Sequence, residues 1–432
     1  VRTDKNNYVD CMGNFGADGI VGPHAEKEGS YYTIKEVWCP VQLTWNDVEK
    51  GELTLSNQYN FVNLKDCRFS YRLLQMPAMG STQVKVLKQG NLSSPDVAPG
   101  KEAQVKIPMM ANADAVEIKA VNHEGEEIMT WSRGVKSEER RVKNSSAPST
   151  SSAAYADQAD AVEVKAGGRT YRFAKKDGRL MGVEVGSKAI SLSNGPRFMA
   201  ARRSDRSLDQ FYNHDDKEAE KKKTLYTEFV DQGAFAGFEW KKAEAKLVAK
   251  YQHGSLGEVD WQFLSDGSVA VTCHYNFGGV VDMMGMAFDY PESKVRSKAW
   301  VGNGPYRVWQ NREQGPQYGY WQNDYNDPIP AESWDYPEFK GYFANVKWMQ
   351  FKTDEGKIGF SGLTADEHMG VYTPRDGRDG LLYTLPQTGL AVFKVIPSVR
   401  NKVNTTDLNG PSAQPKWLNG KGKALFTLNF EL

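Results

Sequence analysis

Apolar and polar residues alternate along most of this chain, and the alternation predicts β-strands. Clear runs are residues 52–57, 68–73, 169–173, 180–185 and 269–273. A period of two places every second side chain on one face of a strand, so that one face packs on a core while the other meets solvent. The pattern therefore predicts an all-β protein built from packed sheets.

The strand pattern falls into two parts with a polar segment between them. Short strands from residue 41 to residue 131, separated by turn residues, predict an immunoglobulin-like β-sandwich over residues 39–133. Residues 134–157 are first charged and then rich in Ser, Ala and Pro, a composition typical of an exposed linker. Alternation then returns, so residues 158–432 are predicted to form one large two-sheet sandwich.

A short amphipathic helix is predicted before the first sandwich and ends at Pro40. The i, i+3, i+4, i+7 spacing of such a helix is followed by Tyr31, Ile34, Lys35 and Trp38. Because the sequence opens at Val1 with neither an initiator Met nor the apolar region of a signal peptide, we expect a cut piece, either a mature or expressed chain or a fragment of a longer polypeptide. We also expect residues 1–36 to be loosely held, since a helix without partners is marginal in water.

Charge and composition exclude several classes of partner. Lys and Arg total 54, as do Asp and Glu, so neither nucleic acid nor an anionic membrane surface is an expected partner. The apolar runs are much shorter than the roughly 18 residues of a membrane-spanning segment. The four cysteines form no C-x-x-C pair, which predicts buried free thiols rather than a zinc site or a disulfide framework.

Aromatic residues concentrate between residues 299 and 351, a segment that contains five of the eleven Trp. Aromatic rings stack on the apolar faces of sugars and also fill the cores of β-sandwiches, so two interpretations compete. For Trp300 and Trp348 the strand-like surroundings favour the core. The candidates for a carbohydrate contact, most of which lie among Gly, Asn, Asp and Pro, are Tyr306, Trp309, Trp321 and Trp334.

Histidines, carboxylates and glycines give no strong catalytic signal. The six His lack the spacing of a helical metal pair, so a metal cage is not predicted. His274 lies in a strand-like run, where it is either a satisfied strand histidine or an acid/base group of a mutarotase-like sugar epimerase. The carboxylate pair of a retaining glycosidase is defined by a separation of about 5 Å, which sequence spacing in a β protein does not reveal. Residues 302–305 are predicted to form a tight turn.

Several segments, in chain order, resemble family 2 glycoside hydrolases of the β-galactosidase type. Residues 15–21 and 32–41 resemble the segment that ends the catalytic TIM barrel and enters the next sandwich. Residues 53–71 resemble the immunoglobulin-like domain that follows. The segments that resemble the last domain of the family are residues 171–180, 195–198, 300–305 and 337–341.

This resemblance implies an architecture for the whole chain. Residues 1–38 would be a short helical remnant of the end of a TIM barrel, and residues 158–432 a galactose-mutarotase-like β-supersandwich. The resemblance also implies that the two catalytic Glu of the family lie upstream of Val1, in a barrel carried by the same or another chain. The sequence then contains no catalytic residue of its own.

The resemblance further implies roles for Phe15 and Asp18 in the complete enzyme. Both positions line the galactose pocket of family members, in which an Asn at the position of Asp18 helps to hold a sodium ion. Asp18 keeps an oxygen ligand for a hard cation, sodium or magnesium, but adds a charge, which changes both the ion and the sugar preference. The family's Glu-Asn after the glycine-proline element is replaced here by Tyr306-Arg307.

The leading hypothesis is a non-catalytic C-terminal portion of a β-galactosidase-like glycosidase. It would buttress the barrel and shape the approach of a β-galactoside or related β-glycoside. One alternative is a free-standing carbohydrate-binding protein that uses the aromatic residues between 306 and 336. The other is a mutarotase-like epimerase that uses His274.

Overall fold

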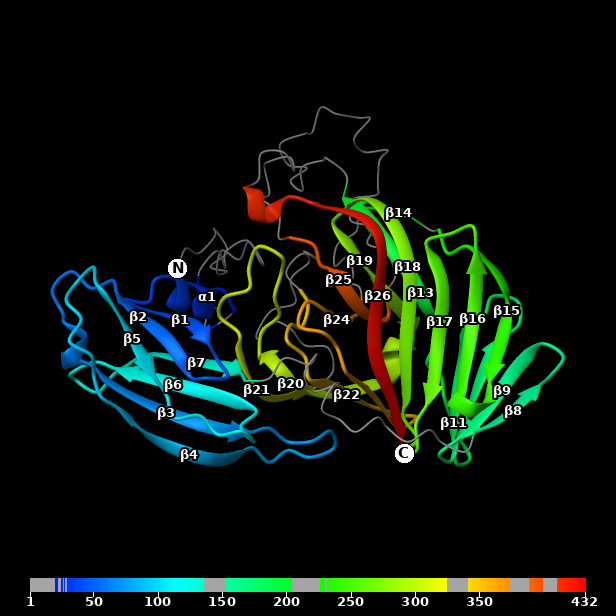
Figure 1. The fold of residues 1–432 in the computed structure, drawn as a ribbon, viewed down its shortest axis with the longest axis horizontal. Coiled ribbons are helices and arrows are strands. Elements are labelled where there is room, and N and C mark those ends of the chain that lie inside the picture. The colour runs from blue at the N-terminus through cyan, green and yellow to red at the C-terminus, as the bar shows by residue number, and fades with distance from the viewer. Residues whose placement is uncertain are drawn as a thin grey trace, which may run out of the picture.

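The structure, a computed structural model, consists almost entirely of β-strands (Figure 1). It describes residues 20–21, 25, 27, 29–135, 153–203, 226–229, 231–324, 341–372, 388–398 and 410–432. Two sandwiches lie side by side along the long axis of the molecule, the N-terminal one in blue and cyan (Figure 1). No helix among these residues is both long enough and apolar enough to cross a bilayer.

The small sandwich consists of two antiparallel sheets. One has the order β1-β2-β5, and its strands are Val41–Asp47, Glu52–Asn57 and Glu102–Lys106. The other has the order β4-β3-β6-β7, and its strands are Lys85–Leu92, Arg68–Gln75, Ala115–Val121 and Glu127–Gly134. The inward positions of these strands form one core, which includes Leu53, Leu55, Phe69, Leu73, Ile118 and Trp131. The predicted alternation is confirmed, because every second residue of β2 is buried.

The large sandwich also consists of two sheets. In the described residues, one sheet has the order β24-β25-β19-β13-β11-β10-β9-β8, with β12 beside β11 and β14 beside β13. Its strands in chain order are Ala154–Asp157, Ala161–Ala166, Arg169–Ala174, Leu180–Val185, Lys188–Ile190, Ser193–Arg203, Tyr226–Phe229, Met283–Asp289, His368–Val371 and Leu390–Val395.

The second sheet of the large sandwich has the order β15-β16-β17-β18-β26-β23-β22-β20-β21 over the described residues. Its strands in chain order are Ala234–Lys241, Lys246–Gln252, Leu256–Phe263, Val269–Val281, Val295–Gly304, Gln317–Asp324, Trp348–Thr353, Lys357–Ser361 and Lys416–Glu431. The long antiparallel pair of β18 and β26 runs through its middle, from Val269 opposite Leu428 to Val281 opposite Lys416. All-β architecture with a small and a large sandwich is the fold that the sequence predicts.

The core of the large sandwich lies between these two sheets and is rich in aromatic rings. Trp261 of β17 is fully buried, and its ring meets the ring of Phe173 of β10 edge to face at 4.9 Å. Trp300 is buried in this core, as predicted. Trp348 is buried as well, but in a separate cluster where it packs with Leu74 and Met76 of the small sandwich, so the prediction that it lies in the inner layer is wrong. The described cysteines Cys39, Cys67 and Cys273 are buried free thiols, as predicted, while Cys11 lies outside the described residues.

The predicted tight turn at residues 302–305 is wrong for its first three residues, which end strand β20. Gly302 pairs with Gly319 of β21, and Gly304 pairs with Gln317. A Cβ atom at Gly304 would lie 2.6 Å from the Trp321 ring, and the Trp321 Nε1 donates a hydrogen bond to the Gly302 carbonyl at 3.1 Å. Gly304 therefore allows close packing of the Trp321 ring on the strand, and Gly302 allows the close approach of the backbone of residues 344–346.

The two sandwiches meet where β7 approaches β21 (Figure 1). The Ser132 backbone N–H donates to the Gln317 side chain at 2.7 Å, and the Ser132 hydroxyl donates to the Tyr318 carbonyl at 2.6 Å. On the same side, the Trp348 Nε1 donates to the Pro77 carbonyl at 2.9 Å. Of the predicted linker, residues 136–152 lie outside the described residues; its start belongs to β7 and its end forms β8, which pairs with β9.

Candidate functional site

Helix α1, Gly29–Val37, is held by the segment between β20 and β21, residues 305–316. The Tyr306 ring packs against the Tyr32 ring at a centroid distance of 5.1 Å, and the Tyr306 hydroxyl donates to the Lys27 carbonyl at 2.7 Å. The Thr33 hydroxyl donates to the Gln314 carbonyl at 3.0 Å. We call this set of contacts, together with those of Glu36 described next, the α1 clasp.

Glu36 forms the most enclosed contact of the α1 clasp. Its carboxylate accepts a hydrogen bond from the Gly315 backbone N–H at 2.6 Å. Burial raises the pKa of Glu36, and the hydrogen bond from Gly315 partly opposes that shift. Next to it, Lys35 forms an ion pair of 2.8 Å with Glu127 of β7, so α1 contacts both sandwiches. Residues 1–36 were predicted to be loosely held, and the described part of α1 has several specific contacts.

An exposed tryptophan, Trp38, follows helix α1. The Trp38 side chain is 76% exposed, and Val37 beside it is also exposed. A large exposed Trp next to an ordered helix is typical of a surface that another segment covers.

The structure separates the aromatic residues that the sequence offers for a carbohydrate contact. Tyr306 belongs to the α1 clasp. Trp309 is only 3% exposed, and its ring meets the Tyr342 ring edge to face at 5.8 Å. Trp321 is half-buried, with its ring against Gly304 of β20. Trp334, and also Phe15 and Asp18 with its predicted cation, lie outside the described residues, and the binding roles of all six residues remain predictions.

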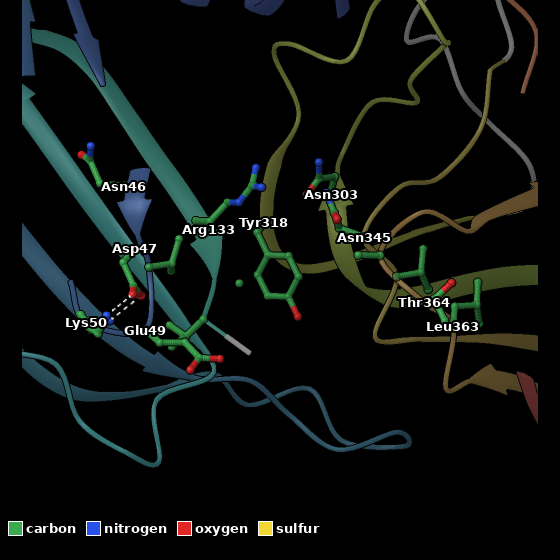
Figure 2. A pocket seen from close by; sticks show the side chains of 15 residues that line it. Asn46, Asp47, Glu49, Lys50, Arg133, Asn303, Tyr318, Asn345, Leu363 and Thr364 are labelled. Carbon is green, nitrogen blue, oxygen red and sulfur yellow. Dashed lines mark hydrogen bonds and ion pairs between the residues drawn. The ribbon is translucent and has the colours of Figure 1, made fainter. Parts of the chain in front are cut away.

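A polar cavity lies between the two sandwiches (Figure 2). The small sandwich contributes residues 46–50 and 133–135, and the large sandwich contributes Asn303, Tyr318, residues 345–346 and residues 363–365. The cavity has a volume of about 500 Å³, within the usual range of small-molecule sites. We call it the inter-sandwich cavity. Sequence analysis missed it, because its lining residues come from segments up to about 300 positions apart along the chain.

Three potential metal ligands meet on the outer face of the nine-stranded sheet. Glu258 and Asp260 project from the same face of β17, and His274 lies opposite Glu258 on β18. The His274 Nε2 is 3.8 Å from the Glu258 carboxylate and 3.6 Å from the Asp260 carboxylate. The group lacks the helical spacing of a metal pair and so is not evident from the sequence. The pattern Glu-x-Asp on a strand, which places both carboxylates on one face, is its one local signal.

A cation already stands beside this cross-strand group. The Lys246 Nζ lies 3.7 Å from the Asp260 carboxylate and 2.9 Å from Glu244, and its pKa is raised, first by the hydrogen bond with Glu244 and then by the charge of Asp260. The Asp260 carboxylate of this group thus already has a counter-charge.

Comparison with models of protein families identifies the family of the chain. The sequence pattern of the beta galactosidase small chain matches residues 165–387, more than half of the chain. The chain belongs to this family. A second pattern, that of beta-galactosidase domain 4, matches residues 53–131, which lie in the small sandwich. The protein is therefore a carbohydrate-processing protein of the family 2 glycoside hydrolase type, as the resemblance implied. No curated protein matches the chain as a whole or in part.

Solved structures resemble this chain only weakly. A putative mutarotase from Salmonella typhimurium is 7% identical, with a TM-score of 0.29, over 67% of this chain and 99% of that one. An uncharacterized protein from Listeria monocytogenes in complex with glucose, magnesium and calcium is 8% identical, with a TM-score of 0.20, over 90% of this chain and 30% of that one.

A third solved structure is the cycloalternan-forming enzyme of Listeria monocytogenes in complex with a pentasaccharide substrate. It is 9% identical, with a TM-score of 0.19, over 90% of this chain and 30% of that one. Because all three TM-scores are low, the fold assignment rests on the sheets of this chain and on its family match.

Proposed function

We propose that this chain is the accessory, non-catalytic part of a β-galactosidase-like glycosidase. In this role its two sandwiches hold the end of a catalytic barrel, in the same or another chain, and shape the approach of a β-galactoside or related β-glycoside. The division into a barrel remnant over residues 1–38, a small sandwich, a linker and a large sandwich belongs to the same proposal. The family match to a small chain and to domain 4 supports it.

The α1 clasp is the observation that carries this proposal. Helix α1 precedes the small sandwich in the chain, yet residues 305–316 of the large sandwich contact it through Tyr306 and the Gly315 backbone. Helix α1 is thereby held against both sandwiches, in a position to connect them to a preceding domain. The exposed Trp38 beside it offers apolar surface on which such an upstream domain can pack.

Activity measurements test the non-catalytic role. The purified chain is assayed at neutral pH on a panel of aryl β-glycosides that includes the β-galactoside, and we expect no turnover from a folded sample. Turnover that a single carboxylate substitution within these 432 residues abolishes would overturn the proposal.

Hydrogen exchange tests the buttressing role. In Tyr306→Phe the ring stays but the hydrogen bond to Lys27 is lost, so the backbone amides of α1 should exchange about fivefold faster, the equivalent of one ordinary hydrogen bond. Tyr320→Phe is the matched control, because the Tyr320 hydroxyl bonds only a neighbouring side chain, Gln322, outside the α1 clasp. Equal exchange of α1 in the two variants would count against a holding role for Tyr306.

A further inference from the structure

The inter-sandwich cavity presents unused hydrogen-bonding groups from both sandwiches. Among the described residues, no side-chain hydrogen bond or ion pair is found for Arg133 of β7, Asn303 of β20 or Asn345. Figure 2 shows Arg133 and Asn303 approaching the cavity from opposite sides, with Tyr318 between the two sandwiches. A guanidinium offers donors only, whereas an amide offers both donors and acceptors, so together they suit a ligand rich in hydroxyl groups.

The charges around the inter-sandwich cavity balance. Two carboxylates, Asp47 and Glu49, and two cations, Lys50 and Arg133, line it. Lys50 and Asp47 already neutralise each other in an ion pair of 2.8 Å. Such a lining does not favour a phosphate or another anion, and it does not favour a cation, so the charge pattern points to a neutral ligand.

The cavity also has apolar surface and a favourable position. Val48, Val346 and Leu363 line it together with the Tyr318 ring, beside the polar side chains. Sugar rings have apolar faces between polar edges, which a mixed lining with an aromatic ring can match. Ligand sites occur preferentially where two domains meet, and the volume suits one or two sugar rings.

We propose that the inter-sandwich cavity binds a neutral saccharide of one or two rings. Because Arg133 belongs to one sandwich and Asn303 to the other, the bound sugar bridges the two and stabilises their contact. This inference goes beyond the proposed function, since binding here requires neither a barrel nor the α1 clasp. The cavity would hold a saccharide as an accessory site, apart from any reacting bond.

Calorimetric titration of the whole chain with lactose and with D-galactose tests this proposal. We expect weak binding that falls about tenfold in Arg133→Met and in Asn303→Leu, as expected for the loss of one hydrogen-bonding group to a ligand. Arg133 is exposed, so its substitution leaves the fold intact even if Asn303→Leu does not. Arg172→Met is the matched control. Arg172 of β10 pairs with Glu163 of β9, and both strands belong to the sheet of the large sandwich that does not contain Asn303.

The outcomes separate clearly. Absence of binding to both sugars, or binding that is equal in Arg133→Met and Arg172→Met, overturns the inference. Stronger binding of a phosphorylated sugar than of lactose also overturns it, because the ligand would then be an anion. None of these results affects the α1 exchange experiment, so failure of this inference is distinguishable from failure of the proposed function.

Discussion

The core of the large sandwich and the α1 clasp hold their parts of the molecule by different kinds of contact. Between the two large sheets, rings such as Trp261 and Phe173 are fully buried. In the α1 clasp, partly exposed groups such as Thr33 and Tyr306 form hydrogen bonds to backbone carbonyls. Burial of one large apolar side chain contributes about 1.5–3 kcal/mol, whereas one hydrogen bond contributes about 1 kcal/mol net.

This difference predicts an order of opening. A core of interlocking rings unfolds only with the whole sandwich, while a helix held by a few hydrogen bonds can detach locally at a much lower free energy. The large sandwich therefore has the higher free energy of unfolding, and the contacts between α1 and the large sandwich open at a lower one.

The largest expected effect is in the core. Trp261→Ala should lower the free energy of unfolding of the large sandwich by about 3–5 kcal/mol, because it removes a fully buried ring and leaves a cavity. Urea unfolding followed by circular dichroism measures this change. Trp417→Ala is the control: Trp417 is 70% exposed on β26 and should cost less than about 0.5 kcal/mol. Similar losses for both variants would contradict the burial argument.

A smaller effect is expected at Glu355, which joins the two large sheets at one end of the sandwich. Its carboxylate accepts hydrogen bonds from the Ser191 hydroxyl at 2.6 Å and the Tyr290 hydroxyl at 3.0 Å, and it pairs with Lys294. Burial by itself would raise its pKa, but the bonds from Lys294, Ser191 and Tyr290 outweigh burial and lower the pKa to about 2. Glu355→Gln should cost about 2 kcal/mol at neutral pH.

The sign of the pH dependence at Glu355 follows from that shift. A folded pKa below the unfolded value means that the stabilisation is complete above about pH 4.5 and is lost as the pH falls toward about 2. Stability curves of wild type and Glu355→Gln should therefore converge over this acid range. Curves that stay parallel down to pH 2 would show that Glu355 does not titrate in this way.

The α1 clasp should respond to pH in the opposite direction. Because the pKa of Glu36 is raised in the folded state, ionisation of Glu36 opposes the clasp, so the protection of α1 should decrease as the pH rises through the range just above 4.5. Glu36→Gln keeps an acceptor for the Gly315 N–H and carries no charge, so it should remove this pH dependence with a change below about 1 kcal/mol at neutral pH. Hydrogen exchange of residues 31–38 at several pH values measures both effects. An unchanged pH profile in Glu36→Gln would assign the titration to another group.

The smallest effect is expected on the solvent face of the small sandwich. Arg72 of β3 forms a two-pronged ion pair with Glu117 of β6, at 2.7 and 2.8 Å. Because the Arg72 side chain is nearly half exposed, Arg72→Ala should cost only about 0.5 kcal/mol, and less at high salt. A double-mutant cycle with Glu117→Ala measures the pair. A coupling as large as the Trp261→Ala loss would refute the contrast between buried and exposed contacts.

The sequence alone determined the strands, their inward faces and the family. Alternation of period two is a local property of the backbone, so runs such as residues 52–57 could be read without knowledge of their partners. The same reasoning placed Trp300 in the core, where it lies, but it did not show that Trp348 packs against the small sandwich. Motifs in chain order were enough to indicate the β-galactosidase family, because they require only colinearity.

Only the tertiary structure decided what the segments between the strands do. Tyr306 and Glu36 are 270 positions apart, and Arg133 and Asn303 are 170 apart, so neither the α1 clasp nor the inter-sandwich cavity has a local signal. Gly302 and Gly304 were mistaken for a turn because the groups that require them, the backbone of residues 344–346 and the ring of Trp321, are distant in sequence. Side-chain periodicity depends only on neighbouring residues in the sequence. A site between two sandwiches depends on which residues their packing brings together, and these are distant in the sequence.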